Sequence, residues 1–449
     1  NKVSTAIQYF DGLGRPKQSI SVQAGGNSED IISHTEYDAL GRQVKEYLPY
    51  SKPTQNGAIN TGNIASEIQR YYKNKYPKDF SGVPLPDVNA YSEKEFDGSP
   101  LNRVLKQAAP GQDWRLNGGH EIEFDYQTNI EGEVTLFGVT TNFSNATYTP
   151  TLTGGNDTYL AGQLYKTITK DENHTEETGK LHTTEEFKNK QGQVVLKRTY
   201  ALINSIERAH DTYYVYDDYG NLTYVLPPKA NSVSSVNTLK NIKNQLNDLC
   251  YQYTYDYRNR LVEKKIPGKG KEVIVYDILD RPVLTQDAIQ KTQKKWLFTK
   301  YDILGRVVYT GIYTHATDIY RPAMQTHFNN NVAVKMYETA LKITGTLGNY
   351  YSNLNFPKTG IEVLTVNYYD DYTFNTLTTA TSANYYGIPF TRNTKGLATG
   401  SKVKVLEEAR WITTISHYDE KARPVYVYSK NDYLGTVDIS ESKLNDFTG

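Results

Sequence analysis

The chain is poor in sulfur and has no excess charge of either sign. Its 449 residues include one cysteine, Cys250, and two methionines. A single thiol excludes an intrachain disulfide and a zinc site of the paired-cysteine type, so we expect Cys250 to be an ordinary buried or half-buried thiol. The 50 Lys and Arg residues balance 50 Asp and Glu residues. This balance argues against nucleic acid or an anionic membrane as the main partner, because both select basic faces.

Long hydrophobic stretches are also missing. No segment approaches the roughly 18 apolar residues that a transmembrane helix needs, so we predict no membrane span. The chain begins at Asn1 without a methionine or a signal-peptide pattern, and it stops shortly after the Tyr433–Gly435 element. These ends suggest a piece of a longer protein.

Tyrosine is the residue in excess, with 39 Tyr against 13 Phe. Other apolar residues are scarcer than in a typical globular domain, so a thick, dry core is not expected. The aromatic content of 12% and the zero net charge are the reverse of a disorder signature. Because tyrosine combines a large ring with a hydroxyl that can stay solvated, the composition predicts a thin, extended β-structure with wet faces.

A pattern close to Tyr-Asp-x-x-Gly-Arg recurs along the chain. It reads Tyr37-Asp38-Ala39-Leu40-Gly41-Arg42 in one copy and Tyr301-Asp302-Ile303-Leu304-Gly305-Arg306 in another. The turn residues of the clearest copies are Asp11, Gly14 and Arg15; Asp38, Gly41 and Arg42; Asp217 and Gly220; Asp256, Asn259 and Arg260; Asp277, Asp280 and Arg281; and Asp302, Gly305 and Arg306. A late copy is Tyr418 to Arg423, and looser copies begin near Phe96, Phe187 and Tyr369.

The spacing Asp-x-x-Gly is typical of a type I β-turn that closes a bulged hairpin. The Asp side chain accepts hydrogen bonds from the backbone ahead, and the fourth position needs positive φ. Gly, Asn259 and Asp280 suit that position, whereas Ala422 does not, so we expect a different turn there. The Arg is expected to reach a turn Asp or to stack on a Tyr ring. We interpret the motif as structural.

The distances between copies match a chain of hairpins. Copies at Tyr255, Tyr276 and Tyr301 are 21 and 25 residues apart (276 − 255 and 301 − 276), enough for two ordinary strands and their turns. Strands are predicted at 272–276, 307–309 and 424–428, and plain antiparallel β over 120–200. Helices are predicted near 64–72, 237–250 (Leu239, Ile242, Leu246 and Leu249) and 331–345 (Val332, Met336 and Leu341).

The copies and the stretches between them divide the chain into four regions, which the family resemblance described below implies are parts of one continuous shell. Residues 1–110 form N-terminal hairpins with an insertion, and 111–200 an antiparallel segment. Residues 201–315 carry the densest repeat run, and 316–449 a further insertion followed by hairpins. The predicted fold is mainly β, with antiparallel hairpins and a few short helical insertions; the family resemblance described below implies that these hairpins form a curved, spiralling sheet, a partial hollow shell.

Catalytic and cofactor patterns are missing from the sequence. None of the eight His lies in a metal or catalytic pattern, and there is neither a phosphate-binding loop nor a Gly-x-Ser-x-Gly turn. Asp217-Asp218 and Asp370-Asp371 lack the regular ligand spacing of a calcium loop. Trp114, Trp296 and Trp411 could stack on sugars, although cross-strand packing is the favoured use. We therefore expect no enzyme activity, no metal and no cofactor.

The motif series resembles the YD repeat of the Rhs family. The resemblance rests on residues 216–229 and 276–287 and on Asp11-Gly12-Leu13-Gly14-Arg15-Pro16, and it is strongest over 1–50 and 213–312. It implies a β-sheet that spirals into a hollow shell around a C-terminal toxin, with a core motif that closes one end and cleaves the chain. Neither that core nor a toxin domain is recognisable in these residues. The segments are similar to the N-terminal part of Rhs proteins from gliding, Gram-negative bacteria.

The resemblance leads to a main functional hypothesis and two alternatives. The chain is expected to be a non-catalytic shell segment of a secreted or cell-surface protein, exported through a dedicated machinery such as the type IX system. Its partners would be the rest of its own polypeptide, with core and cargo, and secretion-machinery or surface proteins. The first alternative is an adhesin that binds glycans or a protein through Tyr and Trp patches. The second is a carbohydrate-active enzyme with two carboxylates about 5–10 Å apart.

Overall fold

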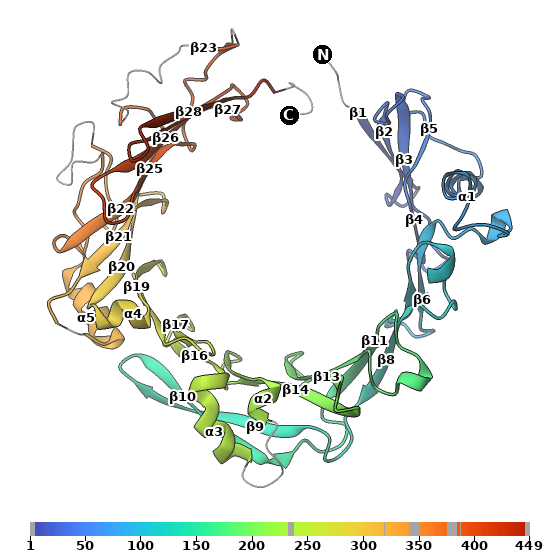
Figure 1. Cartoon of the computed structure of the whole chain (residues 1–449), viewed down its shortest axis with the longest axis horizontal. Helices are drawn as coiled ribbons and strands as arrows, with labels where there is room; N and C mark the ends of the chain where they lie inside the picture. The colour runs from blue at the N-terminus through green and yellow to red at the C-terminus, as the bar shows by residue number, and fades with distance from the viewer. Residues whose placement is uncertain are drawn as a thin grey trace.

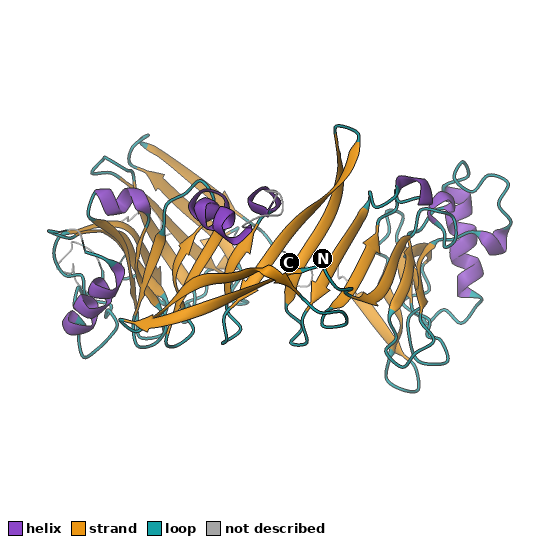
Figure 2. Ribbon diagram, turned by 90° about the horizontal axis from the view of Figure 1, so that it is seen from below, coloured by secondary structure: helices purple, strands orange, loops and turns teal. Residues whose placement is uncertain are grey.

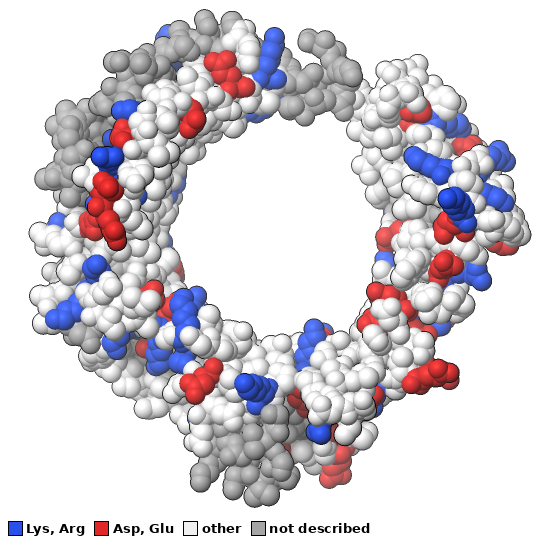
Figure 3. Space-filling view, in the orientation of Figure 1, with Lys and Arg blue, Asp and Glu red and all other residues white. Residues whose placement is uncertain are grey.

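A small N-terminal antiparallel sheet and a long antiparallel ladder of strands bend together into an open ring (Figure 1). The computed structural model describes residues 5–231, 238–317, 319–341, 350–374, 384–386 and 388–444. The two ends of the chain lie near each other at the opening of the ring, and the centre of the ring is empty of protein in the space-filling view (Figure 3). The mainly β fold with a curved antiparallel sheet is confirmed.

The ring begins with a small N-terminal sheet. Its strand order is β1 (Thr5–Phe10), β2 (Pro16–Val22), β3 (Glu29–His34) and β5 (Tyr50–Pro53). An isolated bridge between Thr35 and Glu46 joins this sheet to β4 (Lys45–Tyr47), the first strand of the long ladder. The two sheets therefore follow one another along the same wall.

The long ladder is an uninterrupted series of antiparallel pairs. After β4 it continues through β6 (Tyr91–Phe96), β7 (Val104–Ala108), β8 (Ile122–Thr128), β11 (Tyr165–Lys170), β12 (Thr183–Lys188), β13 (Val194–Ile203), β14 (Ile206–Tyr216) and β15 (Leu222–Leu226). It goes on through β16 (Tyr251–Asp256), β17 (Leu261–Lys265), β18 (Glu272–Tyr276), β19 (Pro282–Gln286), β20 (Lys295–Tyr301), β21 (Val307–Thr314) and β22 (Ile361–Tyr369). It ends with β25 (Ala398–Lys404), β26 (Trp411–Tyr418), β27 (Pro424–Asn431) and β28 (Thr436–Glu441).

A long hairpin branches from the ladder. Strands β9 (Thr135–Ser144) and β10 (Thr147–Thr158) pair with each other, and the end of β10 pairs with β16 at Thr147 and Asp256. Figure 1 places this hairpin outside the ring, over β13 and β14. The small pair β23 (Asn384–Tyr385) and β24 (Ile388–Pro389) stands apart from both sheets.

The helices lie on the convex, outer side of the sheet (Figures 1 and 2). They are α1 (Ile64–Lys75), α2 (Pro228–Asn231), α3 (Thr238–Leu249), α4 (Ala288–Thr292) and α5 (Arg321–Asn331), with short 3₁₀ turns at Leu85–Asp87, Gln112–Trp114 and Glu176–Thr178. The helices cover only part of the sheet, so the wall is thin over much of its length.

Three apolar clusters hold these outer elements to the sheet. The N-terminal cluster packs Ile68 of α1 against Ile20 and Ile32. A middle cluster joins the β9–β10 hairpin and Ile242 of α3 to β13–β15. The largest includes Trp296, Phe298, Tyr309 and Tyr368, with Met324 and Phe328 from α5. The core is thus distributed along the wall, which agrees with the low apolar content of the sequence.

Two predicted helices are present and one is wrong. Helices α1 and α3 fall where the sequence places them, although the side chain of Leu239 lies outside the described residues. The helix predicted over 331–345 is absent from its described part: α5 ends at Asn331, and Val332 is extended with φ −70° and ψ 140°. Pro322 marks the true start, because a proline in the first turn loses no helical hydrogen bond. Residues 342–349 lie outside the described residues.

The turn ladder as candidate functional site

The turn at residues 277–281 shows how one copy of the motif is built. Asp277 Oδ1 accepts the backbone N–H groups of Leu279 and Arg281, both at 2.9 Å. Its Oδ2 accepts Nε of Arg281 at 2.8 Å. The backbone N–H of Asp280 closes the turn on Asp277 O at 3.2 Å, and Asp280 has φ of 62°. One carboxylate therefore fixes two backbone groups and the arginine.

The same arrangement recurs at the other predicted turns. Each turn Asp accepts the N–H groups two and four residues ahead and, through its second oxygen, the side chain of the residue four ahead. The copies are Asp11 with Arg15, Asp38 with Arg42, Asp217 with Asn221, Asp256 with Arg260, Asp302 with Arg306, and Asp419 with Arg423. The positive-φ positions are Gly14, Gly41, Gly220, Asn259, Asp280 and Gly305.

Neighbouring copies are joined through the tyrosine. The guanidinium of Arg281 lies 4.5 Å from the centroid of the Tyr301 ring, and the Tyr301 hydroxyl donates to Pro282 O at 2.7 Å. Equivalent stacking pairs are Arg15 on Tyr37, Arg42 on Phe96, Arg103 on Tyr126, Arg260 on Tyr276 and Arg306 on Tyr369. We call this series of Asp–Arg turns and intervening rings the turn ladder.

The turn ladder follows a single rim of the sheet. Its turns join β1 to β2, β3 to β4, β6 to β7, β14 to β15, β16 to β17, β18 to β19, β20 to β21 and β26 to β27. In an antiparallel ladder every second connection falls on the same edge, so these turns stand side by side. Direct contacts agree with this order: Arg260 Nη1 donates to Asp280 Oδ1 at 2.7 Å, and Arg306 binds Asp370 at 2.6 Å.

The looser copies near Phe187 and Phe96 are both members of the turn ladder, and one further turn was misjudged. Asn189 accepts the N–H groups of Gln191 and Gln193 at 3.0 and 2.9 Å, so an uncharged Asn–Gln pair replaces Asp–Arg. The spacing Asn-x-x-Gly was the available signal. Asp97 binds Arg103 at 2.8 Å across a longer loop. The different turn expected at Ala422 is wrong: Ala422 has φ of 60° and sits in the same turn as the glycines.

The fourth turn position gives a test of backbone conformation. Gly305 has φ of 78° and open space around an added Cβ, so Gly305→Val should lose about 1–2 kcal/mol of unfolding free energy from backbone strain alone. Ala422→Gly should instead gain about 1 kcal/mol, because it removes that strain. Chemical denaturation of both variants measures the changes. Equal stability of both variants and the parent would contradict the turn assignment.

The turn carboxylates predict how stability depends on pH. Hydrogen bonding from the Arg42 backbone N–H lowers the pKa of Asp38, and the Arg103 side chain lowers the pKa of Asp97 to about 2. Groups with a lowered folded-state pKa stabilise the fold above their unfolded pKa of about 3.9 and lose this effect as pH falls. Unfolding free energy should therefore be flat from neutral pH to about 5 and fall below about 4. A loss centred near pH 6 would point to other groups.

Apolar residues cap the turns of this rim. The two central turn positions are exposed and mostly apolar: Leu13, Leu40, Leu101, Tyr219, Tyr257, Ile278, Leu279, Ile303 and Leu304 are 54–79% exposed. A row of large apolar side chains along one edge is unusual for a surface in contact with water alone. We call this row the apolar rim.

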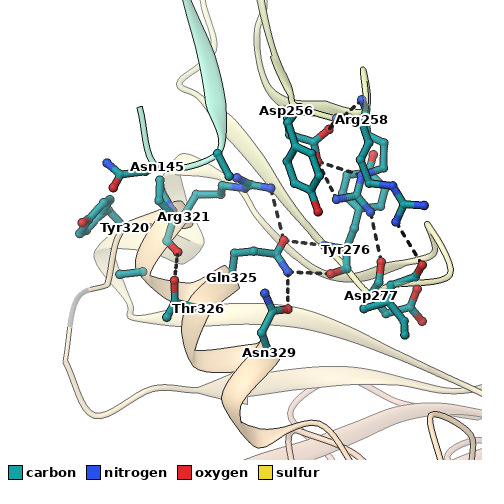
Figure 4. A pocket seen from close by; sticks show the side chains of 16 residues that line it. Asn145, Asp256, Arg258, Tyr276, Asp277, Tyr320, Arg321, Gln325, Thr326 and Asn329 are labelled. Carbon is teal, nitrogen blue, oxygen red and sulfur yellow. Dashed lines mark hydrogen bonds and ion pairs between the residues drawn. The ribbon is translucent and has the colours of Figure 1, made fainter. Parts of the chain in front are cut away.

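A cavity of about 630 Å³ lies beside the turn ladder, between the β9–β10 tip, two ladder turns and α5 (Figure 4). Its acidic side chains, Asp256 and Asp277, are already bound in their own turns. Arg321 is 4% exposed and donates to Ile274 O, Thr147 Oγ1 and Gln325 Oε1 at 3.0–3.3 Å. Burial lowers the pKa of Arg321. The two carboxylates of the cavity are therefore held by backbone and arginine donors.

The other residues considered for binding are scattered. Trp296 is fully buried, so its use as a sugar platform is wrong, whereas Trp114 is 42% exposed and contacts His120 at 5.4 Å between ring centroids. Cys250 is buried as expected, and burial raises its pKa to about 11. Asp370 is held by Arg306, and Asp371 by the Tyr350 hydroxyl. Over the described ranges, no three His, Cys, Asp or Glu side chains gather as a metal site would require.

Charges are spread around the ring. In the view of Figure 3, Lys and Arg alternate with Asp and Glu along the wall, so no face of one sign appears there. None of the helices in the described part of the chain has the length and apolar character needed to cross a bilayer.

Comparison with known proteins gives one partial family match. The family described as "Domain of unknown function (DUF6443)" matches residues 1–128, a span that ends with β8. No curated protein matches the sequence. The family match covers the small N-terminal sheet and the start of the long ladder.

Solved structures of similar shape belong to Tc toxins. They include crystal structures of TcdB2-TccC3-TEV and TcdB2-TccC3-Cdc42, both at 15% identity, with TM-scores of 0.43 and 0.44. A third is the Tc holotoxin pore of Photorhabdus luminescens, at 12% identity and a TM-score of 0.42. Each match covers 98% of this chain, but this chain spans only 21% of each of those chains. At such low sequence identity, the likeness assigns no residue role and no activity to this chain.

Proposed function

We propose that this chain is a non-catalytic wall segment of a hollow Rhs/YD-repeat shell that encloses another part of its own polypeptide. The observation that carries the proposal is the open centre of the ring, bordered by the small N-terminal sheet and the long ladder (Figures 1 and 3). A sheet of ordinary globular proteins buries its concave face against further layers. Here the described helices cover the convex face only, which leaves the concave face free to line a chamber.

The apolar rim supports contact with a further turn of the same shell. Its side chains stand in one row because Arg–Asp contacts fix adjacent turns at a regular spacing. The occupant we propose is the continuation of this polypeptide, wound as a neighbouring layer of sheet. Burial of such a row would contribute roughly 25 cal/mol for each Å² of apolar surface removed from water.

A structural role fits the state of the polar groups. Arginines and aspartates of the repeats are used for one another and for the backbone, so they are not free to act on a substrate. The cavity beside the turn ladder has two carboxylates, as a glycosidase would need, but both accept hydrogen bonds from their own turns. We also propose that the protein is exported to the cell surface or secreted, through a dedicated secretion machinery.

Limited proteolysis of the natural full-length polypeptide tests enclosure. The segment inside the shell should resist protease while the shell is intact. Leu279→Glu with Leu304→Glu should expose that segment, because both changes place charge on the apolar rim without touching the sheet. Ile289→Glu, an equally exposed change on α4, should leave protection intact. Equal digestion of every segment in the parent protein would contradict the proposal.

A further inference from the structure

A buried polar cluster lies beneath the largest apolar core. Lys300 of β20 is 2% exposed, and Glu338, from the segment between α5 and β22, is 1% exposed. Lys300 Nζ lies 3.3 Å from Glu338 Oε1 and donates to Asn355 O at 2.7 Å. It also donates to Oδ1 of the Asn353 carboxamide in a close contact. One amine, one carboxylate and one carboxamide therefore meet in the interior.

Glu338 fixes the geometry of this cluster. Its Oε2 accepts Ser352 Oγ at 2.6 Å and the Leu354 N–H at 2.8 Å, and its Oε1 accepts the Asn355 N–H at 3.0 Å. These donors flank Asn353 in the chain, so the carboxylate that contacts Lys300 also positions the carboxamide. The carboxamide carbon is one C=O bond, about 1.2 Å, from the oxygen that Lys300 contacts.

The surroundings favour a neutral amine. The Phe298 ring centroid lies 5.9 Å from Lys300 Nζ, and Tyr301, Phe328 and Phe356 line an adjoining cavity of only about 20 Å³. Burial lowers the pKa of Lys300 to about 8. About a tenth of the amine is then unprotonated at pH 7 and more at mildly alkaline pH, and a neutral lysine amine is a nucleophile. The cavity is too small for a substrate, so the only electrophile within reach is the protein itself.

We propose that Lys300 and Asn353 become joined by an intramolecular amide bond, with Glu338 as the proton carrier. Glu338 takes a proton from the Lys300 ammonium, and the free Nζ attacks Cγ of Asn353. A second proton moves from Nζ to Nδ2 as the C–Nδ2 bond breaks, and ammonia leaves. It departs as ammonium with the proton that Glu338 held. The products are a secondary amide, one ammonium ion and a Glu338 carboxylate, so atoms and charge balance without a further reactant.

The leaving group has a way out. Asn353 Nδ2 donates to Lys358 O at 2.9 Å on the exposed side of the cluster, opposite the buried amine. Lys166 offers an internal comparison, because it is also buried and contacts Glu133 at 2.6 Å and Glu185 at 3.3 Å. In the described part of the chain, Lys166 contacts these carboxylates rather than a carboxamide. The same chemistry is therefore not expected at Lys166.

The bond would tie the segment between α5 and β22 to the sheet across 53 residues of chain. In the described part of this segment, Tyr350 and Tyr351 belong to the largest core, so a covalent link would keep this part in place under heat, force or protease. The inference depends only on the cluster and stands apart from the proposed function.

Intact mass spectrometry under denaturing conditions tests the bond directly. The purified chain, held at mildly alkaline pH, should be lighter than its sequence by one ammonia, and tryptic digestion should yield a branched peptide that joins Lys300 to Asn353. Asn353→Ala and Glu338→Gln should restore the full mass, whether or not they fold as stably. Asn355→Ala should keep the deficit, because only the backbone oxygen of Asn355 contacts Lys300.

Two results would overturn the inference. A parent chain of unmodified mass would show that the cluster is an ordinary buried ion pair. A deficit without the branched peptide would instead indicate a succinimide at an asparagine, which also loses ammonia but leaves Lys300 free for trypsin.

Discussion

Asp277→Ala should lower the unfolding free energy by about 3–5 kcal/mol, the range for removing one partner of a buried charge pair. The Asp277 side chain is only 2% exposed and accepts two backbone N–H groups and Arg281. Alanine would leave these donors without acceptors and the Arg281 cation without its counter-charge. Chemical denaturation measures the loss.

The chain itself supplies a matched control for this variant. At Asn189 the same turn is built from an Asn and Gln193, whose side chains bond at 2.8 Å. Asp277→Asn alone should therefore remain destabilising, because the amide faces Arg281. Asp277→Asn with Arg281→Gln should lose clearly less than the sum of the two single changes. Additive losses would show that the carboxylate and the guanidinium act independently, against the account of the turn.

Gly311→Ala should cost about 3 kcal/mol or more, the upper range for overpacking a well-packed site. Gly311 of β21 lies where the register with β22 shifts, between Phe298 of β20 and the backbone of Glu362. A Cβ there would lie 2.1 Å from Glu362 O and 2.6 Å from the Phe298 ring. A methyl group would have to separate β21 from β22, and a backbone oxygen cannot move aside as a flexible side chain can. Thermal and chemical unfolding measure the loss.

Two further variants separate the possible causes. Gly311→Ala with Phe298→Leu removes the ring clash but not the backbone clash, so it should recover little stability. Gly98→Ala, where an added Cβ meets nothing within 4 Å, should change stability only slightly. A Gly311→Ala protein as stable as the Gly98→Ala protein would contradict the close packing of β20, β21 and β22.

The parts of the fold that depend on neighbouring residues in the chain are readable from sequence. Asp and Gly three residues apart specify a turn whatever surrounds it, so the copies at Asp38 and Asp302 could be placed. Helix α3 could be placed because its apolar residues recur on one face. The position of helix α5 was predicted wrongly because its sequence, from Arg321 to Asn331, has little apolar periodicity. The main signal for this helix is Pro322 in its first turn.

The parts that depend on distant segments could not be predicted. The pairing of Thr147 with Asp256 brings the β9–β10 hairpin onto β16. Neither segment has a sequence feature that indicates the other as its pairing partner. Lys300, Glu338 and Asn353 each lie in unremarkable stretches, and only folding brings them together. Ala422 was misjudged for a different, local reason: the turn built by Asp419 imposes a positive φ that alanine itself disfavours.

Electron cryo-microscopy of the natural full-length polypeptide tests the shell most directly. The account predicts that these residues form a curved wall around a chamber, with the apolar rim covered by another layer of sheet and separate polypeptide density inside. A structure in which the concave face is filled by the chain's own packed core, or in which the apolar rim faces open solvent and the chamber holds no polypeptide, would contradict it.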